Sequence, residues 1–242
     1  MIAISTLKWA VLLPMYNEES NVDHCVRRLI TFFDREGYTA DIYCVNDGSR
    51  DGTAAALDKV KAEFGDRVHV ITHEVNKGYG GAMRSGFAHA AQNRLDYLIV
   101  MDGDGTQDPK YLANFFAPMQ QGITFIKASR YTKGGRVENV HWKRILISWL
   151  GNKLARLYFR LPVTDYTNGF RAAHRSLFHV LTQTTERGFS VLMEEVKLAR
   201  AAGATFAEVP YTLVGRPAAA SASKFVYSLA VYKSYLNHLR KS

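Results

Sequence analysis

Short apolar runs alternate with segments of helical periodicity along the first 130 residues of the chain. The apolar runs predict strands at 9–13, 41–45, 68–71, 97–101 and 124–128. Helical periodicity predicts helices near 18–35, 52–64, 79–92 and 110–120. Because strands and helices alternate and the strands are apolar throughout, we expect an α/β fold with a mostly parallel central sheet, covered by helices on both faces.

The second half of the chain has a different pattern. Residues 141–161 predict an amphipathic helix in which tryptophan and leucine stand beside lysine and arginine. A further helix is expected at 191–202, a strand at 205–214, and a final helix at 224–240 that is apolar on one side. No internal repeat or linker interrupts the sequence, so one domain spanning 1–242 is the simplest prediction.

Polar, turn-rich segments follow the first four predicted strands, at 14–18, 46–53, 76–81 and 102–109. Ligands of open α/β sheets bind beyond the carboxyl ends of the strands. We therefore expect these segments to form one site at a single edge of the sheet. The third contains Gly78-Tyr-Gly-Gly81, but the first lacks the glycines of a dinucleotide-binding protein, which counts against a dehydrogenase.

Two aspartates separated by a glycine, Asp102-Gly103-Asp104, end the fourth predicted strand. Carboxylates this close on a tight turn suit one divalent cation, Mg²⁺ or Mn²⁺, and the glycine lets the backbone come near. Such a cation would reverse the repulsion between the carboxylates and a nucleoside diphosphate. The plainer alternative is a solvated turn, since Asp-Gly is common in turns.

Other polar side chains at the same edge are candidates for nucleotide contacts. Asp47 suits hydrogen bonds from ribose or base, because the helix that follows it has other residues to cap it. Lys77 can reach a diphosphate, or is a solvated surface lysine. Tyr16 and Glu18 follow the first strand, where a ring can stack and a carboxylate can accept hydrogen bonds. Glu18 alone is explained better as a favourable anion in a first helical turn.

Charge divides the chain unevenly. Residues 1–121 hold 12 basic and 16 acidic residues, net −4, and residues 122–242 hold 19 and 6, net +13. The basic half suits a phosphate-bearing ligand, nucleic acid or an anionic membrane, or is a soluble basic surface. No apolar run reaches the roughly 18 residues of a spanning helix, and no signal peptide is expected. Cys25 and Cys44 are expected to be reduced core thiols.

Several motifs, taken in order, resemble those of a known family. Those of the first half resemble family 2 glycosyltransferases with the GT-A (Rossmann-like) fold: Pro14-x-Tyr-Asn-Glu18, Asn46-Asp-Gly-Ser-x-Asp-Gly-Thr53 and Asp102-x-Asp104. Later segments are similar to the dolichol-phosphate mannose synthase group, which includes bacterial polyprenyl-phosphate glycosyltransferases: Ser129-Arg-Tyr131, Trp142-Lys-Arg144, Asp165-x-Thr-Asn-Gly-Phe-Arg171, Glu208-Val-Pro210 and Ser223-Lys224. The resemblance implies a nucleotide-sugar half at 1–121 and an acceptor half facing a membrane at 122–242.

The resemblance also assigns roles to residues. It implies that the nucleotide is held by Pro14, Tyr16, Glu18, Val45 and Asp47, and the metal and diphosphate by Asp102, Gly103 and Asp104. It implies that the acceptor phosphate is engaged by Arg130 and Arg144, with Ser148 nearby, and that a C-terminal loop with Arg216 and Lys224 closes over the donor. It further implies a third metal ligand two positions after Asp104, where this chain has Thr106 and, one residue later, Gln107.

The implied reaction is an inverting, metal-dependent transfer of a hexose from a nucleotide sugar to a polyprenyl phosphate, with Asp102, Asp104, Arg130 and Arg144 as the catalytic set. The acceptor phosphate, whose second pKa is roughly 6, is already ionised and needs no base. Mannose from GDP-mannose is the first expectation, and glucose or another UDP-hexose is the second. The protein is expected at the cytoplasmic face of a membrane, with helix 141–161 in the headgroup layer and a membrane-protein partner as an open alternative.

Two other functions stay open from the sequence. A transferase to a sugar hydroxyl needs a base, and Glu194 or Glu195 is the candidate, although a structural helix explains both and the arginine pattern indicates a phosphate acceptor. The second alternative function is a non-catalytic membrane adaptor that keeps a sugar-nucleotide pocket. The intact Asp102 and Asp104 count against this alternative. Nucleic acid is not an expected partner, because charge alone supports it and no recognised motif does.

Overall fold

The computed structural model describes residues 3–215 of the chain, except for the side chain of Arg144. The predicted loop at 216–223 and helix at 224–240, with Arg216 and Lys224, lie outside the described residues. The two cysteines are buried free thiols, as predicted.

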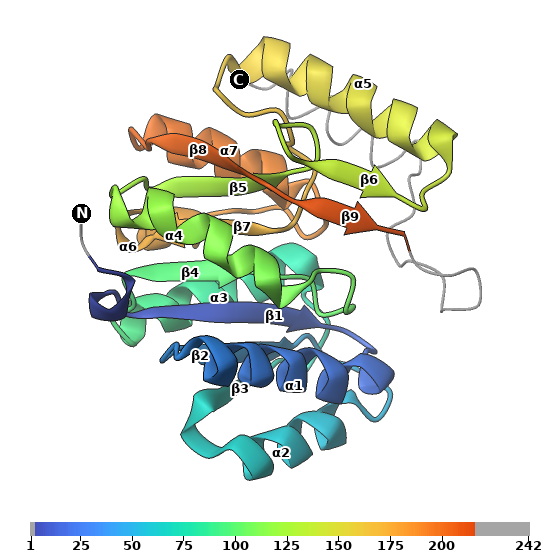
Figure 1. The fold of residues 1–242 in the computed structure, drawn as a ribbon. Helices are drawn as coiled ribbons and strands as arrows, with labels where there is room; N and C mark the ends of the chain where they lie inside the picture. The colour runs from blue at the N-terminus through green and yellow to red at the C-terminus, as the bar shows by residue number, and fades with distance from the viewer. Residues whose placement is uncertain (1–2, 216–242) are drawn as a thin grey trace.

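A seven-stranded sheet forms the centre of the molecule, in the strand order β3-β2-β1-β4-β7-β5-β8 (Figure 1). Its strands are β1 (Trp9–Met15), β2 (Asp41–Asn46), β3 (Val68–Thr72), β4 (Tyr97–Val100), β5 (Phe125–Ser129), β7 (Arg171–His174) and β8 (Phe206–Pro210). Every neighbouring pair is parallel except for the two that involve β7, which is antiparallel to both β4 and β5. The predicted mostly parallel sheet is therefore confirmed.

A two-stranded ribbon of β6 (Arg136–Glu138) and β9 (Thr212–Val214) stands beside the sheet. The single strand predicted at 205–214 is wrong, because it divides into β8 and β9 at Tyr211. The Tyr211 amide donates to the Ser129 carbonyl oxygen at 3.1 Å, while its own carbonyl oxygen accepts from the Arg136 amide at 3.1 Å. The chain thereby passes from the sheet to the ribbon at one residue.

The helices are α1 (Glu19–Glu36), α2 (Thr53–Phe64), α3 (Gly78–Gln92), α4 (Ala113–Gln120), α5 (Trp142–Phe159), α6 (Arg175–Leu181) and α7 (Val191–Ala201). Short 3₁₀ turns lie at Ile4–Thr6, Gly65–Arg67 and Pro109–Leu112. The helix expected near 110–120 is the last of these turns followed by α4. The other helices predicted within the described residues are confirmed to within a few residues at each end.

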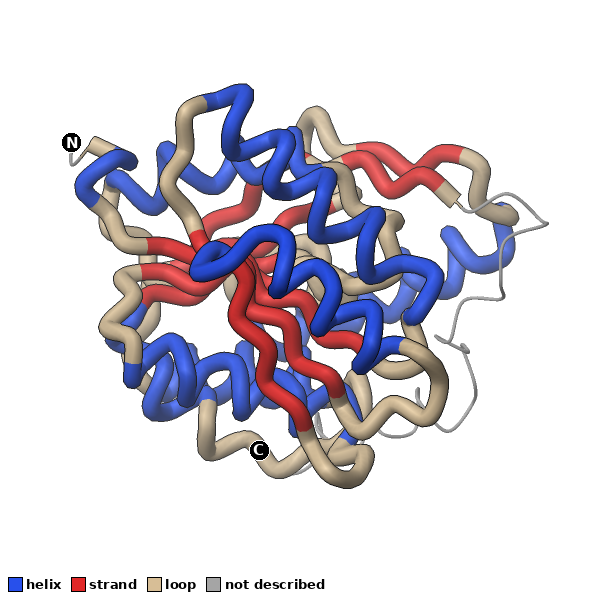
Figure 2. Tube along the Cα trace, turned by 90° about the horizontal axis from the view of Figure 1, so that it is seen from below, coloured by secondary structure: helices blue, strands red, loops and turns tan. Residues whose placement is uncertain are grey.

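The helices cover the sheet on both faces, as Figure 2 shows. The apolar sides of α1, α2 and α4 pack on one face, and those of α3, α5, α6 and α7 pack on the other. Strand β1 serves both layers, because Val11 and Leu13 point to the first and Ala10 and Leu12 to the second. This burial on both sides explains why the strand has no polar alternation.

Strand β7 and helix α6 do not appear in the sequence-based prediction. The strand is Arg-Ala-Ala-His, with the fully buried Arg171 at its start, and so carries no apolar run. Helix α6 is seven residues long, begins at a cap in which His174 accepts from the Ser176 amide, and is too short for a clear period. Both are fixed by tertiary contacts rather than by local pattern.

Candidate functional site

The ends of β1, β2 and β4 meet at one edge of the sheet, as the sequence predicts. The Asp47 amide donates to the Met15 carbonyl oxygen at 2.9 Å, which ties the end of β2 to that of β1. Gly103, just after β4, lies against β1 so closely that a Cβ there would stand 2.6 Å from the Pro14 carbonyl oxygen. Glycine is therefore required at this position for the loop after β4 to reach its neighbour.

Hydrogen bonds join the loops after β1 and β2. The Asn17 amide donates to Ser49 Oγ at 3.0 Å, and the Glu18 amide donates to Thr53 Oγ1 at 2.8 Å. The Glu18 carboxylate accepts from the Asn21 side chain, in the first turn of α1, and makes no hydrogen bond to the described backbone amides at the start of that helix. Tyr16 and Pro14 are half-buried, whereas the Val45 side chain is fully buried in the core. A contact from Val45 to a nucleotide would therefore have to come from its backbone.

Asp47 is the polar centre of the β2 end. Its Oδ1 accepts from His73 Nδ1 at 2.7 Å and from the backbone amide of Lys77 at 2.8 Å. On the far side of the imidazole ring, His73 Nε2 lies 2.8 Å from Ser85 Oγ on α3. The carboxylate thus fixes the start of α3, and the Lys77 side chain stays exposed at this edge.

Asp102 and Asp104 stand at the end of β4, each held by a neighbour in the same loop. Gln107 Nε2 donates to Asp102 Oδ2 at 2.7 Å, and Gln107 Oε1 accepts from the Asp102 amide at 2.9 Å. Thr106 donates to Asp104 Oδ1 through both its amide, at 3.0 Å, and its hydroxyl, at 2.6 Å. The two candidates for a third metal ligand therefore contact different carboxylates. Thr106 is hydrogen-bonded to Asp104, and Gln107 is hydrogen-bonded to Asp102.

The electrostatics of this pair fit a divalent cation. Burial, together with the charge of Asp104, raises the pKa of Asp102 to about 7, although Arg171, Tyr79 and Arg130 act in the opposite direction. Two carboxylates that repel each other in this way are suited to share a cation. The part of the chain that the structure describes has no cluster of three or more His, Cys, Asp or Glu side chains fit to hold a metal. Two carboxylates do suffice for Mg²⁺ when substrate phosphates and water complete its shell.

The predicted acceptor residues Arg130 and Ser148 lie together beneath the start of α5. Arg130 forms a bidentate ion pair with the buried Asp165, with Nε 2.6 Å from Oδ2 and Nη2 2.8 Å from Oδ1. Its Nη2 also donates to Thr167 Oγ1 at 2.9 Å and to Ser148 Oγ at 3.4 Å. Burial alone would raise the pKa of Asp165, but Arg130 holds it below its ordinary value. Arg144 lies in α5, but its side chain is not described.

The two glutamates considered as catalytic bases are both committed to internal contacts. Glu195 is fully buried and pairs with the equally buried Arg171, with Oε1 2.6 Å from Nη2. Glu194 accepts from the Thr185 amide and hydroxyl, both at 2.8 Å, and from the Glu186 amide at 2.9 Å. These contacts favour the structural explanation of the pair over a role as base.

Several residues at the site were given no individual role by the sequence analysis. Asp165 and Arg171 belong to a motif quoted there, but their partners lie 35 and 24 residues away and leave no local signal. Lys127 on β5 is fully buried and donates to the Asn168 carbonyl oxygen at 3.0 Å. Burial and the nearby charge of Arg171 lower the pKa of Lys127 to about 8. Lys127 could have been singled out from the sequence, because a charged residue is rare in a buried apolar strand.

Comparisons with known proteins relate the chain to one family. Residues 10–182 match the model of the family described as Glycosyl transferase family 2. The polyprenol monophosphomannose synthase of Mycolicibacterium smegmatis is 30% identical over 213 residues, which cover 87% of this chain and 79% of that protein. The undecaprenyl-phosphate mannosyltransferase of Micrococcus luteus is 30% identical over 208 residues, covering 85% and 83%.

Solved structures share the fold. The mannosyl-3-phosphoglycerate synthase of Rubrobacter xylanophilus superposes with a TM-score of 0.70 at 19% identity, covering 97% of this chain and 74% of that one. The glucosyl-3-phosphoglycerate synthase of Mycobacterium tuberculosis, crystallised with Mn²⁺, UDP and glucosyl-3-phosphoglycerate, superposes with a TM-score of 0.64 at 19% identity, covering 88% and 74%. These neighbours are GT-A glycosyltransferases, so the predicted fold is confirmed.

Replacing Glu195 by glutamine tests its structural role. Arg171 would then be buried without a counter-charge, so we expect Glu195→Gln to lower the free energy of unfolding by about 3–5 kcal/mol. Urea denaturation followed by circular dichroism measures this loss. Glu74→Gln, at an exposed position, is the matched control and is expected to stay within about 0.5 kcal/mol of the parent. Unchanged stability would contradict this structural role of the Arg171–Glu195 pair.

Proposed function

Because the chain belongs to glycosyl transferase family 2, we propose that it transfers a hexose from a nucleotide sugar to a polyprenyl phosphate, with mannose from GDP-mannose as the first donor. The names of the two curated relatives support the lipid-phosphate acceptor and mannose. The observation that carries the proposal is that a pair of carboxylates and an arginine lie at the same edge of the central sheet. Arg130 pairs with Asp165, which lies four residues before Gly169. Gly169 lies against the Asp102 carboxylate of the Asp102–Asp104 pair. The charge of Arg130 acts to lower the pKa of Asp102.

The proposed chemistry assigns a task to each group. Asp102 and Asp104 would hold a divalent cation, with Thr106 or Gln107 as third ligand, and the bound cation supplies positive charge against the diphosphate leaving group. Arg130, with Arg144 and Ser148, orients the acceptor phosphate. The phosphate oxygen is already ionised, attacks the anomeric carbon directly, and so inverts its configuration without a general base.

The nucleotide contacts follow from the edge formed by β1 and β2. Tyr16, Glu18 and Asp47 lie at the two strand ends, and Lys77 is exposed beside Asp47. A UDP-hexose is the alternative donor, which the UDP complex of a structural neighbour supports. A hydroxyl acceptor is disfavoured because Glu194 and Glu195 are both engaged, and a non-catalytic adaptor is disfavoured because the aspartate pair is intact.

Helix α5 presents an apolar and basic surface that suits a membrane. Its exposed apolar residues are Trp142, Leu146, Ile147, Trp149, Leu150, Leu154 and Leu157. Lys143, Lys153 and Arg156 are exposed on the same helix, and Arg160 is exposed directly after its end. Among the described residues, no helix has the length and apolar character needed to cross a bilayer. We propose that α5 lies in the headgroup layer of an anionic membrane, at the cytoplasmic face of that membrane.

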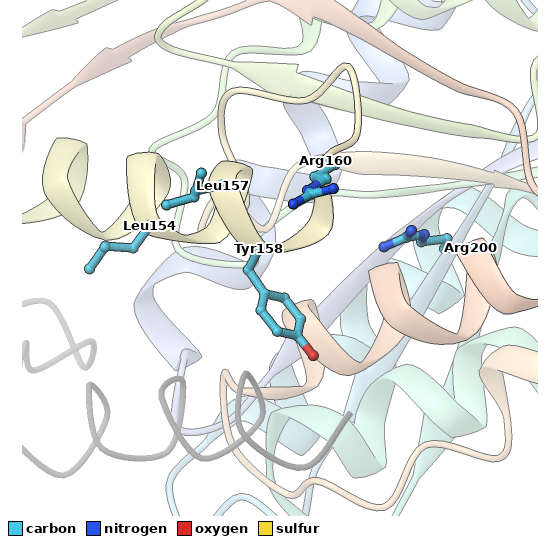
Figure 3. A pocket seen from close by; sticks show the side chains of 5 residues that line it. All are labelled: Leu154, Leu157, Tyr158, Arg160 and Arg200. Atoms are coloured by element: carbon cyan, nitrogen blue, oxygen red, sulfur yellow. The ribbon is translucent and has the colours of Figure 1, made fainter.

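A groove at the C-terminal end of α5 continues this surface. It encloses about 480 Å³ and is lined, among the described residues, by Leu154, Leu157, Tyr158, Arg160 and Arg200 (Figure 3). Arg200 reaches it from α7, where its Nη1 donates to the Phe159 carbonyl oxygen at 2.8 Å. Leucine walls beside two guanidinium groups suit lipid chains with anionic heads.

The donor and the metal are tested by one transfer assay. Labelled GDP-mannose, UDP-glucose and other nucleotide sugars are incubated with a polyprenyl phosphate, and label is counted in the organic phase. We expect transfer from GDP-mannose, its loss in EDTA, and release of the sugar by mild acid. Asp104→Asn is expected to lower kcat/KM by about 100-fold or more, whereas Asp66→Asn, on the surface, should leave it unchanged. Full transfer in EDTA would contradict the metal assignment.

Arg130→Lys tests the acceptor site while keeping a positive charge against Asp165. Lysine cannot reproduce the planar fork of arginine, so we expect the KM for polyprenyl phosphate to rise by about 10- to 100-fold. The KM for the nucleotide sugar should change by less than about 2-fold. Steady-state kinetics measure both constants, with the exposed Arg136→Lys as control. An equal rise in both constants would count against an acceptor role.

Introducing negative charge at apolar positions of α5 tests the membrane contact. Leu146 and Leu150 are 46% and 48% exposed and lie outside the groove, so replacing both by glutamate should not disturb the core. We expect the doubly substituted protein to lose most of its flotation with phosphatidylglycerol vesicles, because glutamate is repelled by anionic lipid. Val75→Glu, at another exposed apolar position, should float like the parent. Transfer to a short, water-soluble polyprenyl phosphate should persist in both variants; unchanged flotation of the double variant would refute the α5 assignment.

A further inference from the structure

A buried chain of polar contacts leads from α7 to the aspartate pair. The Glu195 carboxylate holds Nε and Nη2 of Arg171, and Nη1 of that arginine lies 3.2 Å from the Tyr79 hydroxyl oxygen. The Tyr79 hydroxyl lies beside the Asp102 carboxylate, because a Cβ at Gly169 would stand 3.1 Å from that hydroxyl and 2.6 Å from Asp102 Oδ1. In this position the hydroxyl lowers the pKa of Asp102. Four residues from α7, β7, α3 and the end of β4 are thereby connected.

The donor and the acceptor in this series of contacts follow from the chemistry of each side chain. A guanidinium group only donates, so the Tyr79 oxygen accepts from Arg171. The ionised form of Asp102 only accepts, so the single hydroxyl proton of Tyr79, whose oxygen accepts from Arg171, is available to that carboxylate. The orientation of the hydroxyl is therefore set by Arg171, whose own orientation is set by the bidentate pair with Glu195.

The surroundings leave Tyr79 little freedom. Its ring stacks on Phe189 with centroids 4.7 Å apart, and the next residue, Gly80, donates from its amide to the Arg187 carbonyl oxygen at 2.8 Å. Gly169 passes beside the contact itself. A Cβ at Gly169 would stand 2.6 Å from Asp102 Oδ1 and 3.1 Å from the Tyr79 hydroxyl, so a side chain there would force the two apart.

We infer that Tyr79 is a positioning residue for the metal site: its hydroxyl, oriented by Arg171, holds the Asp102 carboxylate in the rotamer that receives the divalent cation. Gln107 holds Oδ2 of that carboxylate from within the same loop, so the two groups together fix its plane. The inference rests on the proposed function, because it presumes a cation at Asp102 and Asp104. Groups that orient a metal ligand typically change metal affinity by about 10- to 100-fold when removed.

Removal of one hydroxyl tests this role. Tyr79→Phe keeps the ring on Phe189 and deletes only the link between Arg171 and Asp102. Mn²⁺ binding to the full chain is measured by the electron paramagnetic resonance signal of free Mn²⁺, with saturating GDP and, separately, with UDP. We expect the dissociation constant to rise by about 10- to 100-fold. Turnover of the variant should recover at saturating Mn²⁺, which a general loss of structure would not allow.

Tyr166→Phe is the matched control, because the buried Tyr166 hydroxyl has no hydrogen-bond partner among the described residues. It should bind Mn²⁺ like the parent. Gly169→Ala gives a second route to the same effect and serves if Tyr79→Phe does not fold, with Gly188→Ala, where a Cβ meets open space, as its control. Mn²⁺ binding by folded Tyr79→Phe equal to that of the parent overturns this inference alone. A parent protein that binds no Mn²⁺ with either nucleotide overturns the proposed metal site, and the inference with it.

Discussion

Two buried ion pairs, Arg130–Asp165 and Arg171–Glu195, are the constraint on which the site depends. Each guanidinium is more than nine-tenths buried and each carboxylate is fully buried, so neither charge is stable there without its partner. Burying charge in this way contributes little net stability, but breaking a pair is costly, and the geometry around it is therefore fixed. Asp165 lies in the stretch that joins α5 to β7, and Arg171 is the first residue of β7. This stretch is therefore held in place by charges within it and at its end, rather than by apolar packing alone.

The stretch between α5 and β7 contacts both the proposed acceptor site and the proposed donor site. Asp165 orients the arginine expected to meet the acceptor phosphate, and Gly169 lies against the Asp102 carboxylate on the donor side. Its Thr164 and Asp165 amides also donate to Glu208 on β8, at 2.6 and 3.0 Å. A shift of this segment would move an acceptor group and a metal ligand together. We interpret the antiparallel β7, which interrupts an otherwise parallel sheet, as the element that brings the segment to the ends of β4 and β5.

The parts of the fold that were predictable are those with a local signal. Strands β1 to β5 are apolar runs, and the loops that follow β1, β2 and β4 carry turn residues, so both the sheet and its functional edge follow from pattern. Strand β7 begins with an arginine, and only a glutamate from α7 makes that arginine compatible with burial. The Asp102–Asp104 pair was likewise visible in the sequence. Its supporting contacts were not, because Tyr79 and Arg171 reach it from other elements and no spacing rule relates them.

The placement of charge argues for a phosphate acceptor more strongly than the total does. Part of the basic excess of the second half is neutralised inside, since Arg130 and Arg171 each face a carboxylate. The exposed remainder includes the lysines and arginines of α5, which share that helix with exposed tryptophan and leucine. Meanwhile the carboxylates of α7, which a hydroxyl acceptor would need as base, hold Arg171 and the 185–186 turn. We therefore propose, as the acceptor that fits this distribution of charge, a nucleophile that is already ionised and is carried on a lipid bound by a basic and apolar helix.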